Sequence, residues 1–91
     1  MSKDEQQEDA SFTEQALVEA IENQLAAGQP ACTQSVLNKL TLVGYPREES
    51  VQMMAMVLAH EVDDMLRENR PFDAEKYERT LRALPTLPEE S

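Results

Sequence analysis

Residues 51 to 59 read Val-Gln-Met-Met-Ala-Met-Val-Leu-Ala, an apolar stretch that only Gln52 interrupts. No proline or glycine occurs between Pro46 and Pro71, so nothing breaks a helix in this region. A helix that is apolar nearly all round is enclosed on most sides, whereas a surface helix has a polar back. In a chain of 91 residues only a central helix, or one at a subunit interface, is enclosed in this way. The stretch therefore predicts a domain organised around one long helix over about residues 47–69.

Three further helices are predicted around this one by their end signals. Glycine favours the left-handed conformation at a helix C-terminus, and proline cannot continue a helix. No window has the sustained alternation of polar and apolar residues that is typical of a strand. In chain order, the predicted helices span residues 13–27, 31–43, 47–69 and 74–84. We therefore expect an all-α protein, a small four-helix bundle with short connections.

Apolar residues at helical spacing predict which faces pack together. The inner face of the second helix is expected to include Val43. Two hydrophobic staples are predicted at helix starts, Phe12 with Leu17 and Phe72 with Tyr77. The main stripe of the third helix is expected to consist of Val51, Met54, Leu58, Val62, Met65 and Leu66.

The two ends of the chain are too polar to join a core. Residues 1–10 contain no large apolar residue except Met1, so they cannot offset an ordering cost of roughly 1–2 kcal/mol per residue. We predict a disordered acidic tail over residues 1–10, a single helical domain over 11–85 and a short disordered tail over 86–91. A core of this size is marginal without a disulfide, a metal or a partner subunit.

The charge and composition of the chain exclude several classes of partner. The net charge is −10, from 18 acidic and 8 basic residues, and such a surface repels both phosphate backbones and anionic membranes. Residues 33–57 have helix-turn-helix spacing, but Glu48 and Glu49 at the recognition end oppose DNA. The single cysteine excludes an internal disulfide and fits a reducing compartment. With no signal-peptide pattern and no apolar run of about 20 residues, we expect a soluble cytoplasmic protein that binds neither nucleic acid nor membrane.

One cluster suggests metal or acid–base chemistry. A zinc-protease motif would place a second histidine four residues after His60, but that position is Asp64. His60, Glu61 and Asp64 are therefore the candidates for a divalent-ion site in a small metal-dependent enzyme. The competing interpretation, which we favour, is a solvated rim where the apolar half of the third helix meets its charged half. Cys32 falls on an apolar helix face and is predicted to be a packed core thiol rather than a nucleophile.

The methionine-rich part of the third helix offers a different function. We expect Met53 and Met56 to point to opposite flanks of the main stripe, where four helices of this size do not cover both. Together with Val57 they would form an exposed apolar patch of the kind that marks association sites. The sequence therefore predicts a non-catalytic interaction module without a cofactor. It either self-associates, as a homodimer, or binds a partner protein through this helix.

The order of several short segments resembles the C-terminal part of an uncharacterised bacterial all-helical family, a domain of unknown function. The residues that carry the resemblance are Glu19-Ala20-Ile21-Glu22-Asn23-Gln24, Gln29-Pro30, Tyr77, Leu81, Leu84 and Pro85. That family tends to have histidine where this chain has Glu19. The resemblance implies an all-helical bacterial protein and carries no assigned activity.

Overall fold

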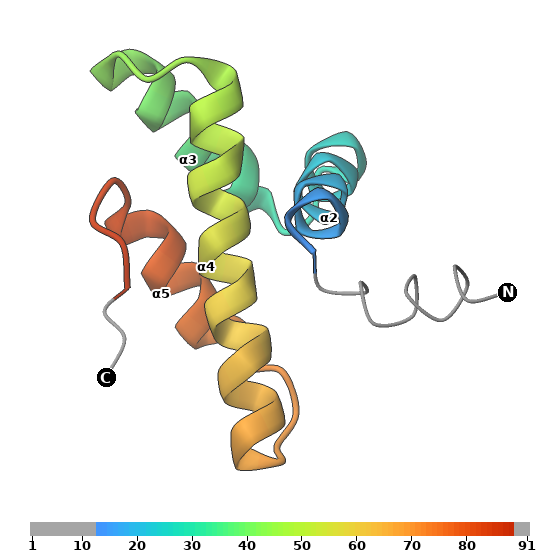
Figure 1. Ribbon diagram of the computed structural model, residues 1–91. Coiled ribbons are helices and arrows are strands. Elements are labelled where there is room, and N and C mark those ends of the chain that lie inside the picture. The colour runs from blue at the N-terminus through green and yellow to red at the C-terminus, as the bar shows by residue number, and fades with distance from the viewer. Residues whose placement is uncertain (1–12, 89–91) are drawn as a thin grey trace, which may run out of the picture.

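A computed structural model of the chain describes residues 13–88 (Figure 1). This part of the chain forms helices and no β-strand. The helices are α2 (Glu14–Ala27), α3 (Ala31–Val43), α4 (Arg47–Glu68) and α5 (Ala74–Ala83). The predicted all-α four-helix bundle is confirmed, and each helix end lies within one residue of its predicted position. The predicted tail over residues 1–10, the staple at Phe12 and residues 89–91 fall outside the described part.

The helix starts follow the predicted capping chemistry. The Thr13 and Asp73 side chains each accept a hydrogen bond from the backbone N–H three residues later, at 3.3 and 3.1 Å. The predicted staple between Phe72 and Tyr77 is also present, with ring centroids 5.3 Å apart in an edge-to-face arrangement. These contacts fix the angle at which the chain enters α5.

The helix ends depend on left-handed residues. Gly28 and Gly44 have φ angles of 72° and 110°, and Asn69 ends α4 with a φ angle of 54°. Glycine adopts this conformation without the steric cost of a Cβ atom, and asparagine tolerates it better than most residues. Three short turns follow, and they bring successive helices back against one another.

Helix α4 is the centre of the bundle. It contacts the other three helices, with α2 on one side, α5 on the other and α3 crossing behind it (Figure 1). Val57 and Met54 are among the α4 residues enclosed by these contacts. The buried apolar core consists of Ile21, Cys32, Val36, Leu37, Leu40, Val51, Met54, Ala55, Val57, Leu58, Tyr77, Leu81 and Leu84.

Two residues predicted to face the core are instead exposed. Val43 is 59% exposed, because α3 ends at Gly44 and the chain turns back so that Tyr45 packs against the core instead. Leu66 is 57% exposed, because the last turns of α4 extend past α2 (Figure 1). The helical spacing of apolar residues therefore predicted the helices correctly, but it placed these two side chains on the buried side of their helices instead of the exposed side.

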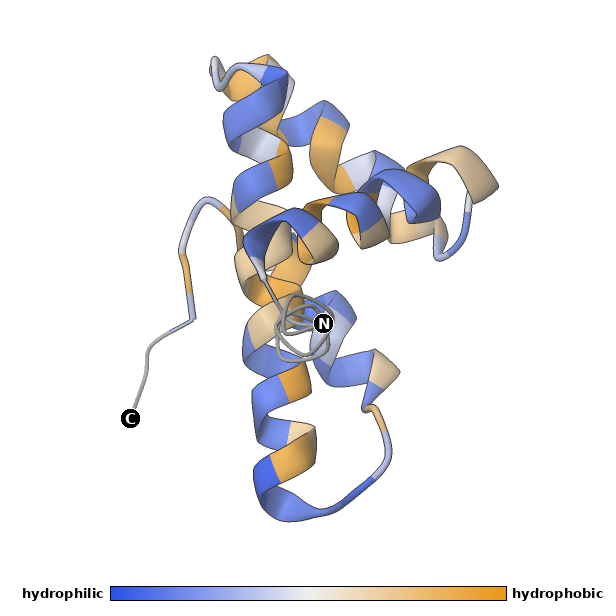
Figure 2. Cartoon of the chain, turned by 45° about the vertical axis from the view of Figure 1, so that its right-hand side comes forward, coloured by the Kyte–Doolittle hydropathy of each residue, from blue (hydrophilic) through white to orange (hydrophobic). Residues whose placement is uncertain are grey.

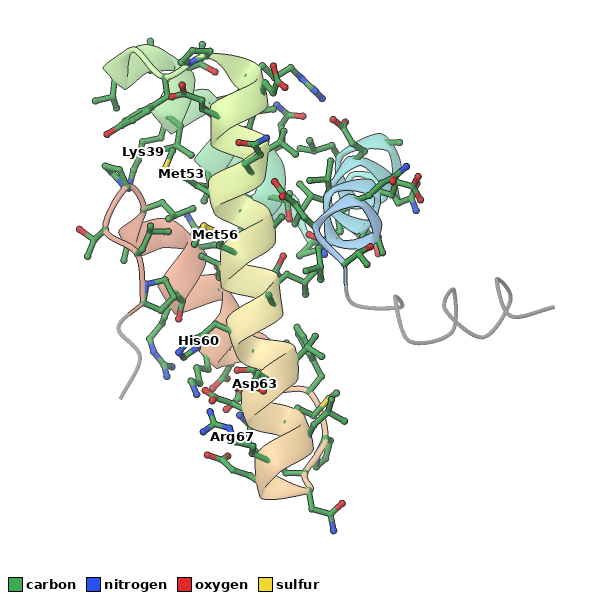
Figure 3. The ribbon with its side chains drawn as sticks, viewed as in Figure 1. Lys39, Met53, Met56, His60, Asp63 and Arg67 are labelled. Carbon is green, nitrogen blue, oxygen red and sulfur yellow. The ribbon has the colours of Figure 1, made fainter. Side chains whose placement is uncertain are left out.

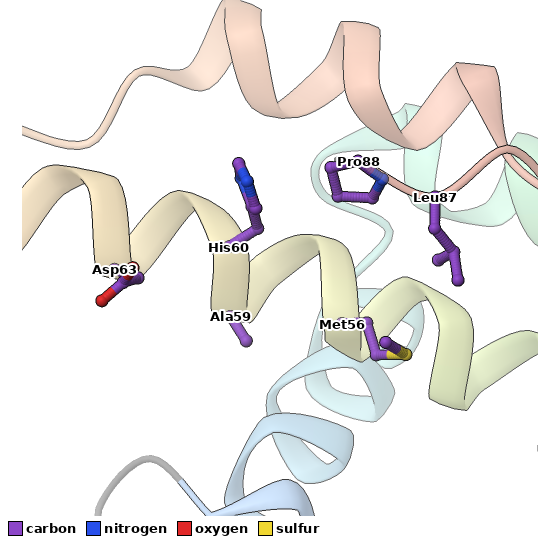
Figure 4. A pocket seen from close by; sticks show the side chains of 6 residues that line it. All are labelled: Met56, Ala59, His60, Asp63, Leu87 and Pro88. Atoms are coloured by element: carbon purple, nitrogen blue, oxygen red, sulfur yellow. The ribbon is translucent and has the colours of Figure 1, made fainter. Parts of the chain in front are cut away.

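The segment after α5 returns along α4. Of the predicted tail over residues 86–91 the structure describes residues 86–88, in which Leu87 and Pro88 lie across a hollow from Met56 and His60 of α4 (Figure 4). The described end of the chain therefore forms part of the surface around α4.

Candidate interaction surface on helix α4

The structure separates the three residues predicted to form an exposed patch. Val57 is only 1% exposed, so its predicted place at the surface is wrong. It follows Met54 by three residues, which keeps both on the inner side of the helix. Met53 is partly buried and packs against the core, while Met56 is 55% exposed. Met53 and Met56 also lie along the same edge of α4 rather than on opposite flanks (Figure 3).

The exposed face of α4 carries a regular stripe of its own. Its members lie four, three, four and three residues apart, a spacing that keeps side chains on one side of a helix and is typical of a coiled-coil seam. We call this face the outer stripe; it consists of Gln52, Met56, Ala59, Asp63 and Leu66. At 1.5 Å per residue it extends over about 21 Å. Met56 and Leu66, its two large apolar members, are 55% and 57% exposed.

Hollows border the outer stripe on both sides. One of about 270 Å³ lies between Met56 and the Leu87–Pro88 segment (Figure 4). A second, of about 360 Å³, lies toward α2 and is lined by Leu17. A third, of about 110 Å³, lies lower on the helix beside Leu66. Ala59 lines all three, so the smallest side chain of the stripe stands where the surface is most recessed.

The two ends of this face differ in charge. Glu48 and Glu49 are exposed in the first turn of α4, where they complement the positive end of the helix dipole. Arg67 is in the last turn, with its side chain 62% exposed. It contacts the carboxylates of Asp63, at 3.2 Å, and Asp64. The face is thus acidic at its N-terminal end, whereas near its C-terminal end Arg67 compensates two carboxylates.

Glu61, one of the metal candidates, is a buried structural carboxylate rather than part of a solvated rim. It is 3% exposed, and its Oε2 accepts hydrogen bonds from Arg70 Nη1 at 2.9 Å and from the Asp73 backbone N–H at 3.0 Å. Its Oε1 has no hydrogen-bond partner, although Lys76 Nζ lies 3.7 Å away. Burial alone would raise the pKa of Glu61, but Arg70, the Asp73 N–H and Lys76 together hold it below its ordinary value. Glu61 therefore ties α4 to the turn that leads into α5.

The carboxylate of Asp64, the second candidate, is also paired with basic side chains. It accepts hydrogen bonds from Lys76 Nζ at 2.8 Å and from Arg67, and His60 Nδ1 lies 3.5 Å from its Oδ2. The hydrogen bond from Lys76 is the main reason that the pKa of Asp64 is lowered. Within residues 13–88, no group of three His, Cys, Asp or Glu side chains is placed to hold a metal ion. The predicted metal candidates instead form a charge cluster with Arg67, Arg70 and Lys76.

Cys32 lies in the core, as predicted. It is 4% exposed, and desolvation is the main cause of its raised pKa. A buried thiol with a raised pKa is a poor nucleophile at neutral pH, because the thiolate is the reactive form.

A polar contact that the sequence reasoning did not identify joins three helices. Gln24 Oε1 accepts hydrogen bonds from the Thr33 hydroxyl at 2.7 Å and from the Tyr77 hydroxyl at 3.2 Å. These residues belong to α2, α3 and α5. Burial of the phenol is the main reason that the pKa of Tyr77 is raised to about 12. The contact satisfies buried polar groups and holds the α2–α3 turn against α5.

No family model, no curated protein and no solved structure matches this chain. The resemblance to a bacterial helical family therefore stays a prediction. Among residues 13–88, no helix has the length and apolar character needed to cross a membrane.

Proposed function

We propose that this protein is a non-catalytic interaction module that self-associates through the outer stripe of α4. The single observation that carries the proposal is the pairing of Met56 and Leu66 on one helix face, each more than half exposed, with Ala59 between them. Large apolar side chains at coiled-coil spacing favour contact with another helix over contact with water.

The size of the surface limits how tightly two copies can bind. Complete burial of a methionine or leucine side chain contributes about 1.5–3 kcal/mol. Because Met56 and Leu66 are each about half exposed, burying the rest of each side chain at an interface would contribute roughly half of that free energy. Both residues occur twice in a symmetric pair, and Leu17 and Leu87 border the face. Association also costs at least 4 kcal/mol in lost translational and rotational freedom. The gain and the cost nearly cancel, so we expect weak association, with a dissociation constant of hundreds of micromolar or higher.

The charge cluster supports a structural rather than a catalytic role for the second half of α4. General acid–base catalysis needs a group that exchanges protons near neutral pH. Glu61 and Asp64 instead have lowered pKa values, since basic side chains stabilise their charged forms.

Sedimentation equilibrium over a range of concentrations, from low to several hundred micromolar, tests the proposal. We expect a reversible dimer for the wild-type chain and a monomer for Met56→Glu, because the new carboxylate would be desolvated at the interface. Leu42→Glu is the matched control: Leu42 is 88% exposed, and it lies at the end of α3 away from the outer stripe. That variant should dimerise like the wild type.

Two results would overturn self-association through this face. One is a wild-type monomer at every concentration, in which case a different protein remains the occupant to consider. The other is a dimer that Leu42→Glu dissociates and Met56→Glu does not. Circular dichroism of each variant shows whether the helices are retained.

A further inference from the structure

We propose that the second copy packs antiparallel on the outer stripe, with the two-fold axis of the dimer passing beside Ala59. This inference rests on the proposed self-association and adds the orientation and register of the partner. Three features of α4 carry it: the position of its smallest side chain, the position of its hollows and the charge of its ends.

Ala59 is the centre of the outer stripe. Gln52 precedes it by seven residues and Leu66 follows it by seven, so the two ends of the stripe are equally distant from this position. In an antiparallel pair related by a two-fold axis at Ala59, Gln52 of one copy lies opposite Leu66 of the other. A small residue at the crossing point lets two helices approach to the short end of the usual 8–10 Å range. The large side chains then flank the crossing point.

The same register places a side chain opposite a hollow. Met56 precedes Ala59 by three residues, so its counterpart on the second copy is near Val62 and Asp63. Those two residues line the hollow of about 110 Å³ together with Ala59 and Leu66. Each copy would thus insert Met56 into the hollow of the other, as a knob enters a hole in a coiled coil. Methionine suits this role, because its flexible thioether adapts to an irregular cavity.

The charges favour the antiparallel orientation over the parallel one. In an antiparallel pair, the exposed Glu48 and Glu49 of one copy approach the end of α4 where Arg67 of the other copy already compensates Asp63 and Asp64, so the glutamates of the two copies stay apart. A parallel pair would bring the four glutamates together in a protein that already carries a net charge of −10. The antiparallel pair also sets opposite ends of the two helix dipoles side by side.

Disulfide cross-linking in oxidised glutathione tests the arrangement. Ala59→Cys alone should form a covalent dimer, because two residues on the axis meet their own copies. Gln52→Cys alone should not, because the two positions would be about 21 Å apart and a disulfide requires Cα atoms within about 7 Å. A mixture of Gln52→Cys and Leu66→Cys should yield at least tenfold more covalent heterodimer than either variant yields homodimer. The unmodified chain is the control, because its Cys32 is buried.

The outcomes separate the two proposals. If Gln52→Cys forms covalent homodimers as efficiently as the mixture forms heterodimers, the copies are parallel and the inference is wrong, while self-association stands. If sedimentation finds a dimer but neither Ala59→Cys nor the mixture cross-links, the register is wrong. If sedimentation finds only monomers, the proposed function itself fails.

Discussion

The two halves of α4 are held in the bundle by different forces. In the first half the buried residues are mainly apolar, as at Met54, Val57 and Leu58. In the second half the most buried side chains are two carboxylates, Glu61 and Asp64. Figure 2 shows the same change, from mostly hydrophobic colouring where the helices meet to mostly hydrophilic colouring toward the end of α4. One continuous helix thus packs through apolar side chains in its first half and is tied to the start of α5 by ion pairs in its second half.

This difference separates stability from specificity. Apolar contacts are non-directional, and their contribution follows the area removed from water. A buried carboxylate is tolerated only where fixed donors surround it, as Arg70 and the Asp73 N–H surround Glu61. The ionic half therefore requires one particular alignment of α5 against α4, whereas the apolar half contributes most of the folding free energy.

The largest expected effect is in the apolar half. Met54 is fully buried, and Met54→Ala leaves a cavity that we expect to lower the free energy of unfolding by about 2–5 kcal/mol. Urea unfolding followed by circular dichroism measures it, with all variants at one protein concentration. Leu42→Ala, at a position 88% exposed, should change stability by less than about 0.5 kcal/mol. Equal losses for the two variants would show that the core does not dominate stability.

The next effect is in the ionic half. Glu61→Gln keeps an acceptor for the Asp73 N–H but removes the charge that Arg70 contacts, so we expect a loss of about 2 kcal/mol at pH 7. The control is Glu75, an exposed acid in the first turn of α5, because Glu75→Gln should cost less than about 0.5 kcal/mol. If both variants unfold at the same urea concentration, the buried ion pair does not hold α5.

The loss at Glu61 should also depend on pH in a defined direction. Its folded-state pKa lies below the ordinary value of 4.5, so its stabilising contribution is present above that pH. The contribution is lost as the pH falls through the folded-state pKa. The stability difference between the wild type and Glu61→Gln should therefore shrink on acidification below about pH 4.5. A difference that stays constant down to acid pH would contradict the ionic role.

The helices could be predicted from the sequence because their end signals are local. Gly28, Gly44, Thr13 and Asp73 act on the backbone within one turn, and each helix end lies within one residue of its expected place. The covered side of each helix was harder to predict. The stretch over residues 51–59 is apolar nearly all round, so its pattern has no polar phase that marks the outer side. That is why the pattern does not show that Val57 is buried, whereas Leu66 is exposed because the last turns of α4 extend past α2.

The candidate surface depended on information that a single sequence lacks. Four-three spacing relates Met56, Ala59 and Leu66 and is visible in the sequence, but it does not show which helix face α2 leaves uncovered. The ion pair of Glu61 with Arg70 was hidden for another reason. The two residues are nine apart and meet only because the chain turns at Asn69. In the sequence, a charged residue that forms an ion pair across a turn cannot be distinguished from one that is exposed to solvent.

A smaller effect is expected where the two kinds of contact meet. Tyr77 has a buried ring, and its hydroxyl donates to Gln24 at 3.2 Å, so Tyr77→Phe should cost about 1 kcal/mol at pH 7. The folded-state pKa of Tyr77 is raised from 10.0 to about 12. Its proton-linked stability is thus fully present below pH 10 and is lost as the pH rises toward 12. The wild type should lose stability over this interval more steeply than Tyr77→Phe in urea unfolding, and parallel pH profiles would contradict this assignment.

The smallest effect should come from an ion pair in the apolar half. Arg47 Nη1 and Nη2 each donate to a Glu22 carboxylate oxygen at 2.8 Å, which joins the start of α4 to α2. The geometry is bidentate, yet the two side chains are 56% and 41% exposed, so water and salt screen the attraction. We expect Arg47→Ala to cost about 0.2–1 kcal/mol in low salt and less in 1 M NaCl. Glu61→Gln should keep most of its larger loss in the same salt, because a buried pair is screened much less. If Arg47→Ala proved as costly as Glu61→Gln, burial would not be what distinguishes the two ionic contacts, and the division of α4 into an apolar and an ionic half would fail.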